Sequence, residues 1–497
     1  MDFNTILQRT AVPNVTAAAS LDKKVDFLAV VLTEAEIEAQ SNVVSFLKKT
    51  AAVNELKKNG HVSGFGGDSD KFEKAIVVLK RAKNNQALNW EGTELSRKVL
   101  HTQQILNPTV LFADSISDAD ALIFLNGLLL GNYKWTRKTD EKSQGFKRYT
   151  DVTVIHKSLK LEGENLWPIQ SSQFALMSRE FGNPRPDTAN PETMLACAKQ
   201  IAQHYNLKIE TIVDKELEKK GLNLIWSVGK GASKRPCLVV LKYEGNPSKP
   251  EDLLAIVGKG VCFDAGGQNL KVVPGMIEDM FADKGGSCVT LAGFCGIVQQ
   301  KLPINAVLGI GYVENLLGED SYHPSDIITS YKGLTVEIGN TDAEGRLCMA
   351  DTYSYLQKNY KPTRLIEFST LTGAAMVGLG YHRGGVWTND EQMANDLLKS
   401  SEVSHETLWR MPLDDEDREN TKSKFADLSN AVPLKYGASG ANRAAAFLEA
   451  FVEEGVKWAH LDIAGPGMFF QDKFASTGGF AGFGTRVLLN YAKNLAN

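Results

Sequence analysis

Four nearly continuous apolar segments recur in the second half of the chain and predict buried β-strands. They span residues 253–257, 304–310, 365–368 and 459–463. Strands that are apolar at every position are typical of sheets covered by helices on both faces. Two similar segments, 25–32 and 109–113, predict further strands near the N-terminus.

Between these strands the apolar positions change to helical spacing. Residues 117–132 have this spacing and end at a Gly-Asn pair, and residues 192–205 have the pattern of an amphipathic helix. Another helix is indicated by apolar positions i, i+3, i+4, i+7 and i+8 before a stop at Gly455, namely Ala444, Phe447, Leu448, Phe451 and Val452. The alternation predicts an α/β fold with a smaller N-terminal domain (1–160) and a larger C-terminal domain (161–497), the larger having a central mixed sheet flanked by helices.

Composition narrows the class of protein. The chain has 497 residues, of which 43% are hydrophobic and 23% charged, with a net charge of −4 and a pI of about 6.1. A charged segment at 134–151 predicts a surface connection, but no long basic run favours nucleic acid as a partner. No apolar stretch reaches the roughly 18 residues that a membrane-spanning helix needs.

The N-terminus and the cysteines point to a reducing compartment. The first residues, MDFNTILQRTAVPNV, lack the basic start and apolar core of a signal peptide. Six cysteines are scattered without CxxC pairs, which predicts small buried residues and neither a disulfide framework nor a zinc knuckle. We therefore expect a soluble cytoplasmic protein.

Polar and small residues follow several predicted strands at the point where each strand ends. These residues are Lys259 and Asp264, then Thr370, Leu371 and Gly373, and finally Ala464 and Gly465. Ligand sites in open α/β sheets form outside the carboxyl ends of strands, so these segments are expected to converge on one site.

Residues 340–347 read Asn-Thr-Asp-Ala-Glu-Gly-Arg-Leu and carry the densest chemistry of the chain. If the segment is extended, the side chains of Asp342, Glu344 and Arg346 point to one side. Carboxylate oxygens suit divalent metal ions, and a guanidinium suits a small oxyanion. A solvated acidic turn is the alternative interpretation of so short a pattern taken alone.

Together, these segments resemble the catalytic half of the leucyl aminopeptidase family (cytosol aminopeptidase, peptidase family M17). The resemblance covers roughly residues 165–497 and includes the family's signature octapeptide, intact at 340–347. Further matching segments are 258–260, 263–264, 266–267, Lys271, 370–374 (TLTGA), 426–430 (ADLSN) and 460–465 (HLDIAG). The resemblance implies a macro-like N-terminal domain, which matches more loosely, and a dimetal peptidase domain.

The resemblance also implies two divalent metal ions lying side by side. Asp264 and Glu344 would bridge the ions, Asp342 would complete one site, and Lys259 and Asp283 would complete the other. Lys259 could bind only as a neutral amine, so the adjacent cations must depress its pKa. Zinc is the metal expected first, with manganese, cobalt or magnesium as alternatives, because carboxylate-rich ligation does not select one metal.

Catalytic and substrate-binding roles follow from the same resemblance. Lys271 would polarise the scissile carbonyl, and Arg346 would hold a bicarbonate ion that acts as general base. The substrate would be a peptide with a free N-terminus, bound through its α-amine. Its first side chain, preferentially leucine or another apolar group, would enter a pocket formed by Met280, Thr370, Leu371, Gly373 and Ala464.

The chain departs from the family pattern in three places. Ala265 stands where a serine is usual, the segment between Lys271 and Asp283 is one residue longer, and Phe281 replaces a frequent basic residue while Lys284 follows Asp283. None of these differences removes a ligand.

Other interpretations stay open from the sequence. A catalytically weakened relative with a structural or binding role is the main alternative, although such a relative would be expected to lose ligands. Nucleic-acid binding as a second role finds no support in the acidic charge balance. The resemblance implies a homohexamer, and His460, within an apolar strand, is expected to be a core residue or to support a ligand.

Overall fold

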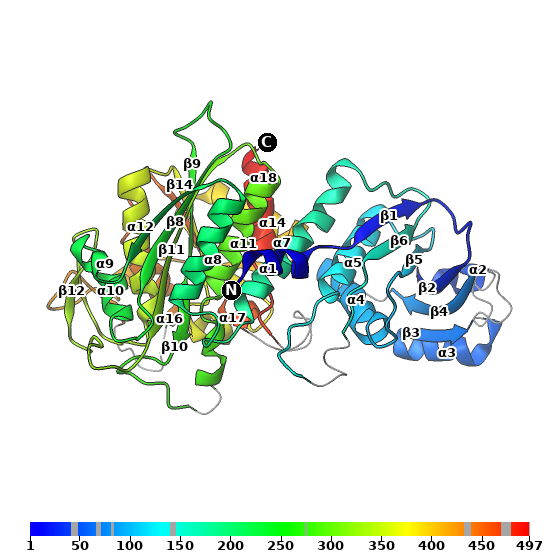
Figure 1. Ribbon diagram of the computed structural model, residues 1–497, viewed down its shortest axis with the longest axis horizontal. Helices are drawn as coiled ribbons and strands as arrows, with labels where there is room; N and C mark the ends of the chain where they lie inside the picture. The colour runs from blue at the N-terminus through cyan, green and yellow to red at the C-terminus, as the bar shows by residue number, and fades with distance from the viewer. Residues whose placement is uncertain are drawn as a thin grey trace. The chain divides into compact units, whose positions relative to one another are not determined.

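The computed structural model describes residues 1–40, 48–65, 71–80, 84–139, 146–273, 276–431, 439–468 and 479–496 (Figure 1). Residue contacts divide the chain into two compact units. The larger unit comprises Met1–Thr10, Phe174–Gln471 and Gly478–Asn497, and the smaller unit comprises Ala11–Gln173 and Asp472–Thr477. The units are defined by contacts between residues and not by independent folding. The domain limits 1–160 and 161–497 therefore stay a prediction.

The smaller unit is built on a six-stranded sheet with the strand order β1-β6-β5-β2-β4-β3 (Figure 1). Its strands are β1 (Asn14–Ala18), β2 (Val25–Leu32), β3 (His61–Phe65), β4 (Phe72–Leu79), β5 (Thr109–Phe112) and β6 (Asp151–Ile155). Neighbouring strands are parallel except β3 and β4. Because side chains alternate along β2, Phe27 and Ala29 join one apolar core while Leu28 and Val30 join a second core.

Helices cover these two cores. Helix α3 (Thr50–Asn59) contributes Leu56 to one core, and α4 (Asn85–Glu94) and α5 (Asp118–Gly131) contribute to the other. Helices α4 and α5 approach so closely that a Cβ atom on Gly127 would lie 1.7 Å from the carbonyl oxygen of Asn89. Only glycine fits at this crossing. The shorter elements are η1 (Glu34–Glu36), α2 (Ile37–Gln40), η3 (Leu95–Leu100, a π-helical turn) and η4 (Gly163–Leu166).

The larger unit is built on a nine-stranded mixed sheet in the order β16-β15-β18-β14-β9-β11-β8-β7, with β10 also paired to β11. Its strands are β7 (Lys208–Val213), β8 (Cys237–Glu244), β9 (Leu253–Gly258), β10 (Gly260–Asp264), β11 (Asn305–Asn315), β14 (Arg364–Ser369), β15 (Gly384–Thr388), β16 (Leu408–Arg410) and β18 (Lys457–Asp462). Strands β18, β14, β9 and β11 are mutually parallel, so their carboxyl ends share one edge. Beside this sheet lies a three-stranded one formed by β12 (Ile327–Thr329), β13 (Thr335–Glu337) and β17 (Leu428–Ser429).

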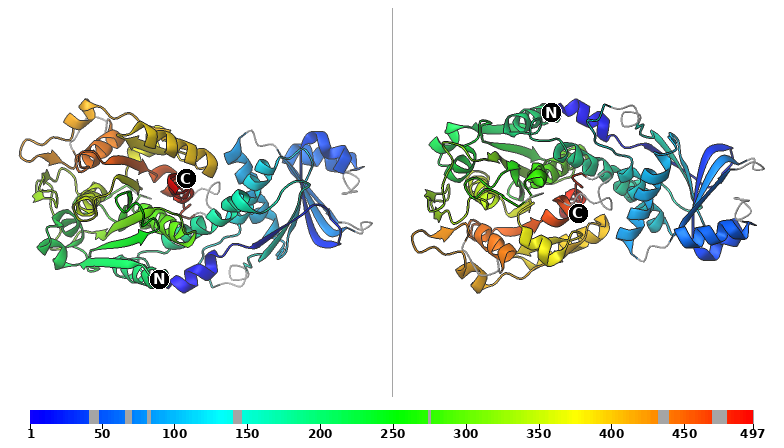
Figure 2. Two further views of the ribbon diagram at one scale, coloured as in Figure 1. Left: turned by 90° about the horizontal axis from the view of Figure 1, so that it is seen from above. Right: turned by 90° about the horizontal axis from the view of Figure 1, so that it is seen from below.

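Helices lie on both faces of the large sheet (Figure 2). Helices α10 (Asn223–Gly229), α12 (Glu344–Tyr360) and α16 (Gly440–Glu449) share one core with Ala255 and Val257 of β9. On the other face, α11 (Gly285–Gln299) packs on β9 and β14 together with α18 (Thr485–Ala496), which contacts α14 (Glu391–Ser404). The remaining helices are α1 (Phe3–Thr10), α7 (Trp167–Gly182), α8 (Pro191–His204), α9 (Lys215–Lys219), η5 (Ile277–Ala282), α13 (Gly373–Leu379), α15 (Asp415–Glu419) and α17 (Ala464–Met468).

The predicted α/β class is confirmed, and differences lie at element ends. Strand β11 continues to Asn315 instead of ending at 310. Helix α16 stops at Glu449, because the amides of Phe451 and Val452 bond three residues back and close a tight turn. Within 134–151, residues 140–145 lie outside the described part, and 134–139 and 146–150 contain no helix or strand. All six cysteines are buried and free, as expected.

Candidate metal centre and peptide site

The site lies where strands of the large sheet end and short loops begin. Strand β10 delivers Asp264 at its last position, and its pairing with β11 is irregular between Val261 and Phe263. A bulge of this kind re-aims the side chains that follow it. The side-chain amide of Asn315 (Nδ2), at the end of β11, then donates to Asp264 Oδ1 over 2.8 Å, which fixes the carboxylate at the sheet edge.

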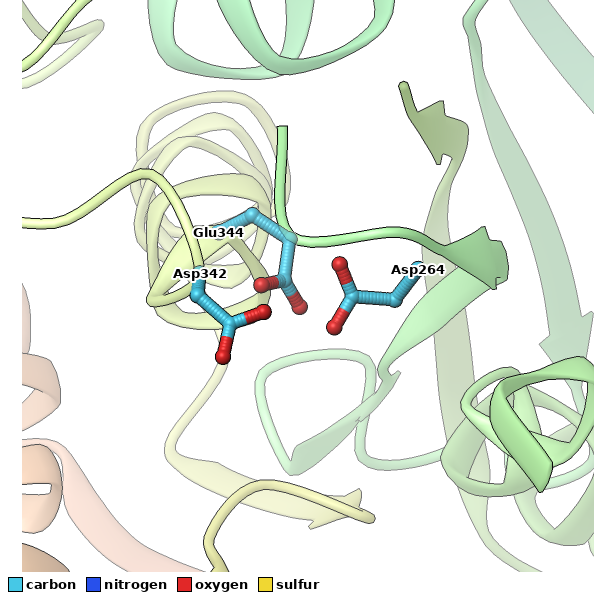
Figure 3. Close-up of side chains that lie close together, drawn as sticks. All are labelled: Asp264, Asp342 and Glu344. Carbon is cyan, nitrogen blue, oxygen red and sulfur yellow. The ribbon is translucent and has the colours of Figure 1, made fainter. Parts of the chain in front are cut away.

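Three carboxylates converge at this edge (Figure 3). Asp264, Asp342 and Glu344 each offer an oxygen, and these oxygens lie within 4.8 Å of one another. Asp264 and Glu344 are buried, and Asp342 is partly buried. The expectation of an extended segment at 342–346 is wrong, because Glu344 is the first residue of α12 and Arg346 lies in its first turn. The carboxylates still meet, since the turn before the helix directs Asp342 back toward Glu344.

Two lysines neutralise part of this cluster. Lys259 Nζ lies 2.7 Å from Asp283 Oδ2 and 3.0 Å from Glu344 Oε1, and it donates to the carbonyl of Thr370 over 3.2 Å. Lys271 Nζ lies 2.9 Å from Asp264 Oδ2 and 2.5 Å from Asp342 Oδ1. The structure therefore brings together all four carboxylates and both lysines that the sequence indicated.

Burial and mutual repulsion shift the pKa values of these groups. Burial raises the pKa of Glu344. The nearby carboxylates raise this pKa further, whereas the two lysines lower it. The pKa values of Asp264, Asp283 and Asp342 rise for the same reasons. Burial alone would lower the pKa of Lys259, but the carboxylates around it raise that pKa above its ordinary range. Every shift reflects more negative than positive charge in a place shielded from water.

The donor set fits a divalent cation. Four carboxylates face only two ammonium groups, which leaves a surplus of two negative charges. Among the described residues, Glu344 Oε2 is buried without a hydrogen-bond donor, whereas Asp283 Oδ2, Glu344 Oε1 and Asp342 Oδ1 face the lysine ammonium groups as ion pairs. Buried carboxylate oxygens without donors are costly unless a cation binds them, and oxygen-rich sets suit hard divalent ions.

The predicted pocket residues lie on η5 and on the segments that follow β14 and β18. Thr370 Oγ1 donates to Asp283 Oδ1 over 3.0 Å, so the first loop residue after β14 contacts a predicted ligand directly. Met280 lies half-buried on η5, which packs against α17, where Ala464 is buried. Gly373 is exposed at the start of α13, which also packs against α17, and Leu371 is partly buried.

One buried carboxylate joins the two loops that carry these residues. Asp462, 1% exposed at the end of β18, accepts from the backbone amides of Leu371 (3.2 Å) and Ala464 (3.1 Å). Its other oxygen accepts from Thr372 Oγ1 over 2.7 Å. The loops after β14 and β18 are therefore held in one fixed relation by a single side chain.

The departures from the family pattern leave the cluster intact. Ala265 is buried, and its amide bonds to the carbonyl of Asn315. Lys284 points away from the carboxylates, because its Nζ donates to the carbonyls of Gly182 (3.1 Å) and Pro184 (3.0 Å) and to that of Phe281. Residues 274 and 275 of the longer segment lie outside the described part.

Sequence reasoning missed the residues that hold the ligand loops in place. Asn269 and Thr341 bond to each other's loops, and Asn430 bonds to the segment 339–343. Asn430 belongs to the matching segment 426–430, but nothing in its neighbours indicated what it contacts. His460 is fully buried, paired with the carboxylate of Glu367 and stacked on the ring of Trp387, which agrees with a core position.

Comparison with known proteins identifies the family. Residues 176–489 match the family model described as cytosol aminopeptidase family, catalytic domain. The chain belongs to the cytosol aminopeptidase family. Among members of that family, the probable cytosol aminopeptidase of Sinorhizobium fredii is 36% identical, covering 73% of this chain and 72% of the relative. That of Chlamydia trachomatis is 34% identical over 89% of this chain and 90% of the relative.

Solved structures agree with this family fold. A bottromycin maturation enzyme in complex with Mn is 25% identical, with a TM-score of 0.80 over 95% of this chain and all of that one. A tomato leucine aminopeptidase has a TM-score of 0.83 at 24% identity, over 97% of this chain and 96% of that one, and shares the fold. As a member of the cytosol aminopeptidase family, the chain is a peptidase-class hydrolase. No helix in the described ranges is long and apolar enough to cross a membrane.

Proposed function

We propose that this chain is a metal-dependent aminopeptidase that removes N-terminal amino acids, preferentially leucine or other apolar residues, from peptides. The observation that carries the proposal is the buried surplus of carboxylate charge, with oxygens of Asp264, Asp342 and Glu344 within 4.8 Å of one another. A purely structural cluster would be expected to balance its charges, because uncompensated buried charge is costly.

In this proposal the chain holds two divalent ions through five side chains. Asp264, Asp342, Glu344 and Asp283 would hold the ions, together with Lys259 as a neutral amine. When bound, the ions would lower the pKa of a water and polarise the peptide carbonyl. Zinc is the expected metal, and the Mn complex of a structural neighbour shows that its fold accepts manganese.

Two cationic side chains would act on the substrate and its base. Lys271, already 2.9 Å from Asp264, would turn its ammonium toward the oxygen that gains negative charge in the tetrahedral intermediate. Burial lowers the pKa of Arg346 to about 10, partly offset by Glu344, so the guanidinium stays charged at neutral pH. Its Nη1 donates to the carbonyl of Asn430, and its buried Nε has no partner among the described residues, so it is available to a bicarbonate base.

The predicted pocket favours an apolar first side chain. Beside Thr370, Ala464 and Met280, a Cβ atom on Gly467 would lie 3.5 Å from Thr370 Cγ2 and 3.6 Å from Phe480 Cε2, so the wall continues through small and aromatic groups. Such walls accept leucine-sized guests and discriminate among similar ones only modestly. A cytoplasmic homohexamer acting on free N-termini completes the proposal.

The deciding experiment is hydrolysis of leucyl-7-amido-4-methylcoumarin by metal-loaded protein. We expect turnover that chelation abolishes and that Zn²⁺ or Mn²⁺ restores. The N-acetylated substrate is the matched control and should not react, because it lacks the free amine. Absence of turnover across a panel of N-terminal residues by protein of verified metal content would refute the proposal and favour a binding role.

A further inference from the structure

The side chain of Asn430 is devoted to the loop that carries the predicted ligands. Asn430 is 1% exposed and follows β17. Its Oδ1 accepts from the amides of Gly339 (2.8 Å) and Asn340 (3.2 Å). Its Nδ2 donates to the carbonyls of Asn340 (2.7 Å) and Ala343 (3.2 Å). A carboxamide offers two donors and accepts about two bonds, so its entire capacity is used on the backbone of 339–343.

The backbone of Asn430 reaches the other end of the same motif. Its carbonyl accepts from Arg346 Nη1 over 2.7 Å. The loop 339–343 contains Asp342 and leads directly into Glu344. Asn430 therefore bonds to the backbone that carries both carboxylates and also to the guanidinium of Arg346. The backbone at Gly339 lies against the backbone that follows Asn430. A Cβ atom on Gly339 would lie only 1.9 Å from the carbonyl oxygen of Ala431.

We propose that Asn430 is a positioning residue that sets the direction of Asp342, Glu344 and Arg346. This inference rests on the proposed function. A ligand loop without regular secondary structure can adopt several backbone shapes, and four bonds from one rigid amide select a single shape. Residues that orient metal ligands in this way typically change metal affinity or activity by about 10–100-fold when removed.

A second asparagine in the same unit provides a matched control. Asn305, 4% exposed at the start of β11, accepts from the amide of Asn246 (3.0 Å) and donates to the carbonyls of Asn246 (2.9 Å) and Lys249 (2.8 Å). It therefore clamps a loop with a comparable set of backbone bonds. Because β11 is 11 residues long, Asn305 lies about 30 Å from the carboxylates at the far end of the strand.

The test compares Asn430→Ala with Asn305→Ala in the full chain. Both variants should lower the unfolding temperature by similar amounts, since each leaves a similar set of backbone groups without partners. Only Asn430→Ala should also weaken Mn²⁺ binding, titrated with the metal alone, by about 10–100-fold, and lower kcat by a similar factor with less change in KM. Equal Mn²⁺ affinity and kcat in the two variants would overturn the positioning role.

Near-isosteric variants keep the test decisive if the alanine variant of Asn430 does not fold. Asn430→Asp retains the acceptor for Gly339 and Asn340 but loses both donors, whereas Asn305→Asp makes the same change far from the site. The Mn²⁺ titration separates this inference from the proposed function. If the unaltered protein binds Mn²⁺ but hydrolyses nothing, the proposed function fails while a loss of affinity in the Asn430 variants still supports the positioning role.

Discussion

Polar groups gather at the carboxyl ends of parallel strands in both units, yet they are organised differently. In the smaller unit, Glu36 accepts hydrogen bonds from the amide and hydroxyl of Ser115, and Lys80 pairs with Asp120 at 2.7 Å with both side chains at least one-fifth exposed. In the larger unit, the side chains of Asp264, Asp283 and Glu344 are at most 3% exposed, and Asp342 beside them is partly buried. A position at the strand ends is common to both, so what distinguishes the candidate metal centre is a surplus of negative charge in a mostly buried place.

The largest effect is expected from removing Glu344, a carboxylate proposed to hold the metal ions. Glu344→Gln should lower kcat/KM by about 10³-fold or more, because the metal pair contributes several kcal/mol to the transition state. Metal analysis should show fewer than two ions per chain. Glu36→Gln is the matched change in the smaller unit and should leave both quantities unchanged. A Glu344 variant with full metal content and activity would remove the basis of the comparison.

Loss of Lys271, proposed to stabilise the oxyanion, should have the next largest effect. Lys271→Met should reduce kcat by about 10²–10³-fold, as removal of an oxyanion donor does. Metal binding should persist, since the methionine no longer competes for Asp264 and Asp342. The control is Lys80→Met, which breaks a partly exposed pair and should cost at most about 1 kcal/mol of stability. An unchanged kcat in the Lys271 variant would contradict its assignment.

Metal removal should affect the two units unequally. At a metal concentration of about 100 times Kd, binding stabilises the folded state by about 2.7 kcal/mol. Hydrogen exchange should therefore slow on metal addition in β9, β10 and α12, and stay the same in β2, β4 and β5. Uniform protection of both sheets would show that the centre is not confined to the larger unit.

The smallest effect concerns two glutamates with opposite pKa shifts. Burial raises the pKa of Glu314, on β11, to about 7, whereas hydrogen bonds from Ser115 and Thr33 outweigh burial and lower the pKa of Glu36. A raised carboxyl pKa means that the folded state binds more protons, so the contribution of Glu314 to stability is present at acid pH and is lost as pH rises from about 4.5 through 7. Glu36 contributes in the reverse sense and loses its contribution as pH falls.

The Glu314 variant tests this sign. Allowing for screening by nearby solvent, the loss should be about 1–2 kcal/mol. Denaturant unfolding at pH 5 and pH 7.5 should show a smaller difference for Glu314→Gln than for the unaltered chain. Glu36→Gln should leave this difference nearly unchanged, because the contribution of Glu36 is lost only below its ordinary pKa of 4.5. An unchanged difference in Glu314→Gln would mean that Glu314 is ionised throughout.

The sequence predicted the parts of the molecule that depend on local pattern. Continuous apolar runs predicted the strands that carry the site, because a strand buried on both faces needs apolar residues at nearly every position. The limits of β2 match those predicted. The resemblance to the family predicted that Lys259, Lys271 and the four carboxylates share one site. Their proximity in the structure agrees with that expectation, while their roles stay a prediction.

What the sequence did not predict depends on contacts between distant segments. The irregular pairing before Asp264 has no marker in the residues 260–264, since it arises from register against β11. Asn430 bonds to a loop 91 residues away in the sequence, a distance over which periodicity carries no information. The helix beginning at Glu344 agrees with the apolar spacing after that residue, but the extended form considered for 342–346 was wrong. A turn and a strand can both place residues two apart on one side.

The bonds of Asp462 have a consequence for how this protein can diversify. One carboxylate fixes the backbones after β14 and β18, while the side chains that line the pocket take no part in that bracing. The loop backbones and the side chains of the predicted pocket can thus change independently. Except at Thr370, whose hydroxyl bonds to Asp283, substitutions at the predicted lining should alter which N-terminal residue is accepted without moving these loop backbones. The preference could then be engineered one side chain at a time.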